Sequence, residues 1–208
     1  MYAIVTDGSI SSYLNHPKAI TIGDVQYPAK IFSVWSKSEL NAIGIYEITF
    51  NNSNKKDEQW YINTNQTFTY DASAGTVTAA YGTATARAYA DTTWTQADSD
   101  NGDLPDNKEV GDIKTEGLKT QLIRTVKAQA AGILQDTDWY IVRKADAGTA
   151  VPSTITTHRA AVRTKAAEME TAITNAADTP ALETLYTYTK QEDGSVTRPL
   201  GEFPKLES

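Results

Sequence analysis

The residues best suited to chemistry lie close together between positions 137 and 163. Asp138 is followed at once by Trp139 and Tyr140, and Arg143 comes four residues after the tryptophan. A carboxylate, a guanidinium and two large rings favour ion pairing and ring stacking, which are interactions of binding surfaces. The segment is therefore a candidate for recognition of a partner.

Two arginines of the following helical run lie where they can engage this turn. Arg159 and Arg163 are four residues apart, so they project from one face of a helix. We expect Asp138 to pair with one of them and lock the turn. Two interpretations of Trp139 stay open. It either plugs the open end of a helical hairpin, or forms a docking surface with Tyr140 and Arg143.

Catalytic and metal-binding patterns do not emerge along the chain. His16 and His158 are its two histidines, and neither has zinc-ligand spacing around it. A run of acidic residues from Asp98 onward has part of the spacing of a calcium loop, but Gly102 falls at its fifth position instead of its sixth. The sequence contains neither the Gly-x-Ser-x-Gly motif of serine hydrolases nor a glycine-rich phosphate-binding loop. We expect no catalytic residue, no metal, no cofactor and no enzymatic activity.

Composition and charge limit the classes of partner that the chain is expected to bind. The chain has 208 residues, no cysteine and a net charge of −7, and nearly all of that charge comes from residues 91–117, where eight carboxylates meet two lysines. No region carries the basic excess that binds nucleic acid. The apolar runs are much shorter than the ~20 residues that span a bilayer, and the N-terminus lacks a signal-peptide pattern. We expect neither nucleic-acid binding nor membrane insertion.

The positions of strand and helix signals predict an α+β fold in four parts. Residues 1–90 read as an antiparallel β-rich domain with one short helix, which a capping box at Ser36 and Glu39 begins and Gly44 ends. Strand patterns there also place Trp60 and Ile62 on one face. The acidic residues 91–117 read as a linker or long surface loop.

The C-terminal part reads as helical. Residues 118–189 predict an antiparallel hairpin of two long helices, plus a short third helix capped by Thr179. Residues 190–208 read as an extended arm, whose Phe203 and Leu206 could anchor on a neighbouring molecule.

The residue order of the 137–163 segment resembles the helical module of bacteriophage tail assembly and tail-fibre assembly proteins, over roughly the last 90 residues. The residues that carry the resemblance are Asp138, Trp139, Arg143, Pro152, His158, Arg159, Val162 and Arg163. In that family a tyrosine usually stands where this chain has His158. The resemblance implies a non-enzymatic protein of the virion tail, made in the host cytoplasm.

Three functions remain open from sequence. The first is a permanent adaptor that docks tail and tail-fibre proteins, with self-association as a possibility. The second is a tail-fibre assembly chaperone that leaves the finished particle. The third is a glycan receptor-binding tail protein, in which the rings of Trp35, Trp60 and Trp94 stack on sugars.

Overall fold

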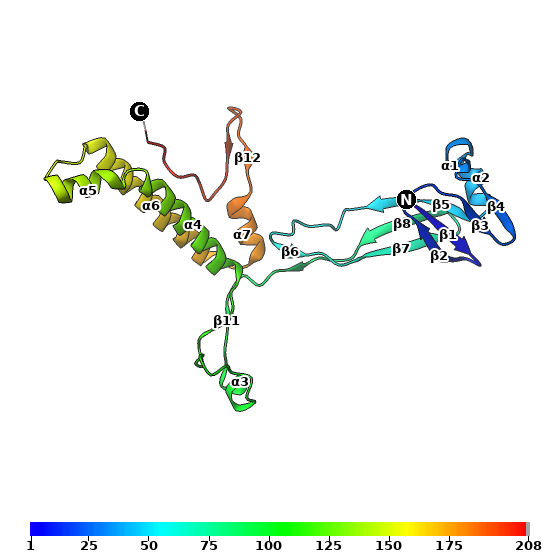
Figure 1. The fold of residues 1–208 in the computed structure, drawn as a ribbon, viewed down its shortest axis with the longest axis horizontal. Coiled ribbons are helices and arrows are strands. Elements are labelled where there is room, and N and C mark those ends of the chain that lie inside the picture. The colour runs from blue at the N-terminus through cyan, green and yellow to red at the C-terminus, as the bar shows by residue number, and fades with distance from the viewer. Residues whose placement is uncertain (207–208) are drawn as a thin grey trace. The chain divides into compact units, whose positions relative to one another are not determined.

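The computed structural model describes residues 1–206 and separates into two compact units, Met1–Thr85 and Ala86–Ser208. The regular structure of the first unit is mainly strand and that of the second mainly helix, so the predicted α+β class is confirmed (Figure 1). The boundary falls at residue 85, five residues before the predicted end of the β-rich domain.

The first unit is built on a five-stranded sheet. Its strands, in the order of the sheet, are β2 (Ser9–Leu14), β1 (Tyr2–Thr6), β5 (Ile45–Asn51), β8 (Thr76–Tyr81) and β7 (Gln66–Asp71). The predicted antiparallel pairing is found between all neighbours of this sheet except β5 and β8, which run parallel, with Ile48 opposite Val77. The chain leaves β5, reaches the far edge as β7 and turns back as β8, so the β7–β8 hairpin docks on β5 with β8 parallel to it.

The sheet curls until its two edge strands come together. Tyr13 on β2 and Phe68 on β7 stack with ring centroids 4.7 Å apart. Ala3, Val77 and Ala79 are fully buried in the cluster that fills this curl. Small side chains at the centre of the sheet leave room for the aromatic rings of the edges, which explains how five strands bend so far.

Two short helices cover the sheet, where one was predicted. The unpredicted α1 (Ile31–Val34) starts from a turn in which the Ile31 N–H donates to the Pro28 carbonyl. The predicted α2 (Lys37–Ala42) has its capping box at Ser36 and Glu39. Gly44 follows with φ of +82°, and a Cβ there would lie 2.6 Å from the Val5 carbonyl oxygen. Glycine is therefore required both by the conformation and by the close approach of β1.

Smaller strand pairs complete the first unit. β3 (Ile20–Ile22) and β4 (Val25–Tyr27) form a hairpin around Gly23 and Asp24. β6 (Tyr61–Ile62) pairs with β9 (Thr85–Ala86). The expectation that Trp60 and Ile62 share a face is wrong, because Trp60 lies in the turn before β6 and is buried while Ile62 is exposed.

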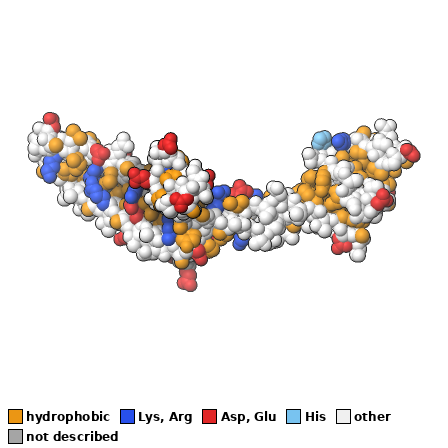
Figure 2. All heavy atoms as spheres, turned by 90° about the horizontal axis from the view of Figure 1, so that it is seen from below, with side chains coloured by type: hydrophobic (Ala, Val, Ile, Leu, Met, Phe, Trp, Pro, Cys, Tyr) orange, Lys and Arg blue, Asp and Glu red, His pale blue; other side chains and the backbone are white. Residues whose placement is uncertain are grey.

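The second unit is organised by two long antiparallel helices, α4 (Leu118–Gln135) and α6 (Ser153–Asn175). Helical periodicity predicts these buried side chains: Leu118, Leu122, Val126 and Ala130 on α4, and Ile155, Val162, Ala166, Met169 and Ile173 on α6. Ile133, which belongs to the predicted stripe of α4, is only half-buried. Lys127 pairs with Glu170 across the outer surface at 3.4 Å. On the face shown in Figure 2, the basic and acidic side chains of this unit are interspersed.

The acidic segment has more structure than a linker. β10 (Thr92–Thr93) pairs with β11 (Ile113–Thr115), and α3 (Gln96–Asp100) lies in the loop between them. Asp98 supplies the capping box of α3 through Thr95 and also receives a 2.6 Å hydrogen bond from the Lys114 ammonium. These local polar contacts order a segment that has almost no apolar core.

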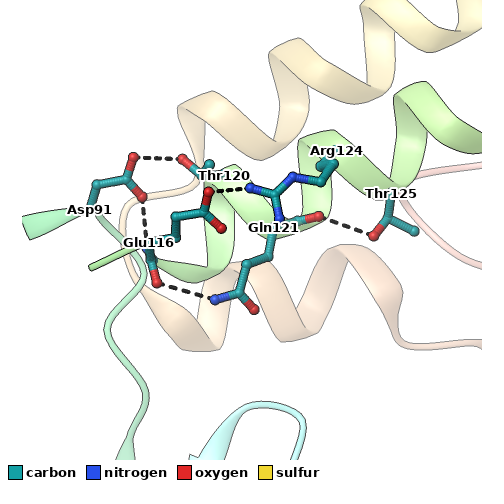
Figure 3. A network of polar contacts seen from close by, with 7 residues as sticks. Asp91, Glu116, Thr120, Gln121, Arg124 and Thr125 are labelled. Atoms are coloured by element: carbon teal, nitrogen blue, oxygen red, sulfur yellow. Dashed lines mark hydrogen bonds and ion pairs between the residues drawn. The ribbon is translucent and has the colours of Figure 1, made fainter. Parts of the chain in front are cut away.

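Residues 86–91 close the start of α4, a role that explains why the unit begins at Ala86. The N–H groups of Leu118 and Lys119 donate to the carbonyls of Ala88 and Tyr89, each at 3.0 Å. The Asp91 carboxylate accepts from the Gly117 N–H at 2.7 Å, and Figure 3 shows it beside the first turn of the helix. A Cβ on Gly117 would lie 2.8 Å from the Tyr89 oxygen, and still closer to Ala90.

The end of the chain folds back on its own unit. α7 (Thr179–Tyr186) begins at the cap Asp178, which accepts from the Ala181 N–H at 2.8 Å, so the predicted cap at Thr179 is off by one residue. β12 (Thr189–Lys190) and β13 (Val196–Thr197) then form a small hairpin where an extended arm was expected. Beyond it, Leu200 is buried and its N–H donates to the Leu185 carbonyl.

Candidate docking surface

The segment between the two long helices is itself a helix, α5 (Asp138–Ala147), where the sequence predicted a loop. Asp138 in its first turn suits the positive end of the helix dipole. Gly148 ends it in the left-handed conformation, with φ of +66°. None of its residues is buried. A ten-residue helix that buries no side chain depends on the contacts at its start for its position.

Arg159 supplies those contacts. Its side chain is buried, and its Nη1 donates to the Leu134 carbonyl at 2.6 Å and to the Thr137 hydroxyl at 2.7 Å. Its Nη2 lies 2.8 Å from the Asp138 carboxylate. One guanidinium thus caps the end of α4, through a carbonyl that carries the negative end of the dipole, and ties the first residue of α5 to α6.

The expected lock forms with one arginine only. Arg159 is the partner of Asp138, whereas Arg163 is exposed and directs its Nη1 to the Arg159 carbonyl at 3.4 Å. Thr137 completes the lock: it is buried, and its hydroxyl donates to the Leu134 carbonyl at 3.0 Å. No charge or spacing pattern in the sequence marks Thr137 for this role.

The opposite end of the hairpin repeats this chemistry with a lysine. Lys119, in the first turn of α4, donates from Nζ to the Thr174 carbonyl in the last turn of α6 at 2.7 Å. The same ammonium lies 5.2 Å from the centre of the Tyr89 ring. Each long helix therefore caps the C-terminal end of the other with a cation, which favours the antiparallel pairing.

Trp139 does not plug the hairpin, and that interpretation is wrong. Its side chain is 51% exposed, and those of Ile141 and Val142 are 43% and 65% exposed. The Arg143 guanidinium lies 4.6 Å from the Trp139 ring centre and 5.4 Å from that of Tyr140. Because residues three and four apart share a helix face, Trp139, Val142 and Arg143 form one surface, which we call the α5 face.

The α5 face is more rigid than its exposure implies. The Trp139 and Tyr140 rings pack against each other with centroids 3.9 Å apart. Arg143 lies against both rings, and its Nε is buried without a hydrogen-bond partner among residues 1–206. Ring stacking therefore holds the Arg143 guanidinium where hydrogen bonds would usually do so. Such an arrangement presents a preformed apolar and cationic surface.

The two anchors expected in the C-terminal arm differ in what they can reach. Phe203 is half-buried and lines a cavity together with Ile133 of α4, so it is already engaged within its own unit. Leu206 is 45% exposed. The arm is further fixed by Arg198, whose Nε lies 2.8 Å from Glu202. The Tyr188 hydroxyl donates to Glu202 at 2.6 Å, and this bond to the carboxylate raises the pKa of Tyr188.

The tryptophans proposed as a sugar-stacking platform are not one surface. Trp60 is 3% exposed and belongs to the interior. Trp94 is covered by the Lys114 ammonium, 4.3 Å from its ring centre. Trp35 packs edge-on against Tyr27, with centroids 5.8 Å apart. The prediction of a shared Trp35, Trp60 and Trp94 platform is therefore wrong.

Two polar residues of α6 are buried, although neither was expected in the core. His158 and Arg159 are 9% and 7% exposed. They lie three and four residues after Ile155 and complete the spacing to Val162, which is the spacing of the buried stripe. That position in the stripe was the signal that they face inward.

Within residues 1–206, no three histidine, aspartate or glutamate side chains gather as metal ligands do. Across the same residues, every helix is too short or too polar to cross a membrane. No protein-family model, curated protein or solved structure matches this chain.

Proposed function

We propose that this chain is a non-enzymatic structural protein of a bacteriophage tail, an adaptor that docks tail and tail-fibre proteins in the virion after synthesis in the host cytoplasm. The observation that carries the docking role is the α5 face. Its tryptophan and valine are exposed, its arginine is held in place by stacking, and its first turn is fixed by the buried Arg159. The resemblance of the 137–163 segment supplies the class of partner.

The composition of the α5 face fits a protein partner. Tryptophan and arginine are enriched among residues that dominate binding energy, and apolar side chains at the centre of an interface gain from leaving water. Arg143 is already oriented by Trp139 and Tyr140, so binding costs little side-chain entropy. The face is thus better suited to stable docking than a flexible loop of the same composition.

Purified particles provide the test. We expect mass spectrometry to find the chain in a fixed ratio to the tail proteins, and Val142→Lys to reduce its incorporation at least tenfold. Lysine favours a helix at least as well as valine does, so α5 itself persists. Val110→Lys, at an exposed valine of the same unit, is the matched control and leaves incorporation unchanged.

The alternatives give different results in the same experiment. A chain that is absent from particles but raises the yield of fibres is an assembly chaperone. A chain whose incorporation survives Val142→Lys docks through another surface. Trp139→Ala, which removes the ring under Arg143, is expected to act like Val142→Lys while changing the melting temperature little, because the ring is half exposed.

A further inference from the structure

His158 is a buried polar side chain without a partner. It is 9% exposed, and no residue in 1–206 forms a hydrogen bond or ion pair with its ring. Its ring nitrogens are not sealed by protein atoms, and the residue lines two neighbouring cavities of about 360 and 290 Å³. The ring is therefore placed to bind something in that space.

The larger cavity has the chemistry of an anion site. Around His158 it is lined by three hydroxyl side chains, Ser153, Thr154 and Thr157, and by Lys205 from the C-terminal arm. Among residues 1–206, no carboxylate lines it. Hydroxyl, imidazole and ammonium groups all donate hydrogen bonds, and only the imidazole and the ammonium can carry charge, which is positive. An oxyanion would meet donors on several sides.

The first turn of α6 adds to this preference. Pro152 is its N-cap and supplies no side-chain acceptor, so the first N–H groups of a 23-residue helix lack a side-chain cap. They carry the positive end of the helix dipole, which favours bound anions. The helix terminus and the unpartnered His158 are separate observations that indicate the same ligand charge.

We propose that this cavity binds a small organic oxyanion, a phosphate or carboxylate group attached to an apolar body. A volume of about 360 Å³ is at the lower end of small-molecule sites and exceeds the needs of a bare ion. Pro204 and Leu206, which close one side, give the apolar body its contacts. The oxyanion lies between the His158 ring and the Lys205 ammonium. The site is independent of the proposed tail role.

Nuclear magnetic resonance of the full chain tests the site, because the chain has only two histidines. Phenyl phosphate and benzoate are expected to shift the ring resonances of His158 in a saturable way and to leave those of His16 unchanged. Phenol, which has the same ring and no charge, should cause less than a tenth of the shift at equal concentration. An equal effect of phenol would overturn the proposal.

Calorimetric titration of variants with phenyl phosphate adds a second readout. Lys205→Gln and His158→Gln should each weaken binding about tenfold, while Lys127→Gln, an exposed lysine on α4, leaves it unchanged. Lys205 is exposed, so its replacement tests the site even where His158→Gln disturbs folding. Unchanged affinity in Lys205→Gln, or equal loss in Lys127→Gln, would show that charge recognition in the cavity is absent.

Discussion

The two ends of the helical hairpin use the same contact in different surroundings. At one end Arg159 donates to the last turn of α4, and at the other Lys119 donates to the last turn of α6. Arg159 is buried and has a hydroxyl and a carboxylate as further partners, whereas Lys119 is half-buried and lies beside a tyrosine ring. A buried cation needs compensating partners, and a cation near water does not.

The first way to test this difference is to remove the buried cation. Arg159→Met keeps the apolar stem but deletes the bonds to Leu134, Thr137 and Asp138, so we expect a loss of about 3 kcal/mol in the free energy of unfolding. Urea unfolding followed by helical circular dichroism measures it. Arg163→Met, at an exposed position four residues on, is the control with little effect. Equal losses in both variants would remove burial as the explanation.

The second test introduces a clash with the backbone at the end of the helical hairpin where Lys119 lies. In Gly117→Ala, the added methyl group meets the backbone of Tyr89 and Ala90, and backbone cannot move aside as a flexible side chain does. We expect a loss of about 2 kcal/mol from this overpacking. Gly132→Ala is the matched control, because a Cβ there meets nothing within 4 Å. A stable Gly117→Ala chain would mean that residues 86–91 cap α4 only loosely.

A smaller change isolates the carboxylate that accompanies Arg159. Asp138→Asn leaves the shape and removes the charge, and we expect a cost of about 1 kcal/mol because the Asp138 side chain is 56% exposed and screened by water. Combining it with Arg159→Met in a double-mutant cycle measures the coupling directly. A coupling near zero would mean that Arg159 fixes this turn through Leu134 and Thr137 alone.

Lys119, the half-buried counterpart of Arg159, should matter less. Lys119→Met removes one hydrogen bond to the Thr174 carbonyl, which water can then satisfy, and keeps the apolar stem beside Tyr89. We expect a loss of less than about 1 kcal/mol in the same urea experiment. A loss as large as that of Arg159→Met would contradict the comparison between the two ends.

The smallest effect is expected at an ion pair on the surface of the acidic segment, between Asp98 and Lys114. The Lys114 ammonium and the Thr95 hydroxyl and N–H hold the pKa of Asp98 far below its usual range. Such a carboxylate contributes stability above the unfolded pKa near 3.9, and loses it as pH falls below that value toward the folded pKa. Protection of the Thr95 amide from hydrogen exchange, relative to its intrinsic rate at each pH, should fall over that interval, and Asp98→Asn should abolish the change.

Much of the helical unit was predictable because its stripes are long and regular. The boundaries of α6 and the buried faces of both long helices follow from spacing alone. α5 was missed because Trp139, Ile141 and Val142 do not form an inward stripe, and a helix that buries nothing leaves no periodic signal. The strap of residues 86–91 was missed because it acts through backbone carbonyls, which sequence does not distinguish.

The first unit was harder to derive where pairing joins distant segments. The α2 capping box is local and was found, whereas β2 was overlooked because three serines hide its alternation. The parallel pairing of β5 with β8 depends on how a hairpin docks, and no local pattern encodes that choice. In the candidate site, the Asp138 and Arg159 pair was predictable from charge and spacing, but not the exposure of Trp139.

The meeting of β2 and β7 in the curled sheet also bears on aggregation. An open sheet leaves rows of unsatisfied amide and carbonyl groups along its outermost strands, and those rows can recruit strands from other chains. Here Tyr13 and Phe68 bring the outermost strands against each other. The sheet therefore offers no flat edge on which a strand of another chain could pair. Replacing Phe68 by a small residue would therefore loosen the curl and expose both rims to fibril-like pairing.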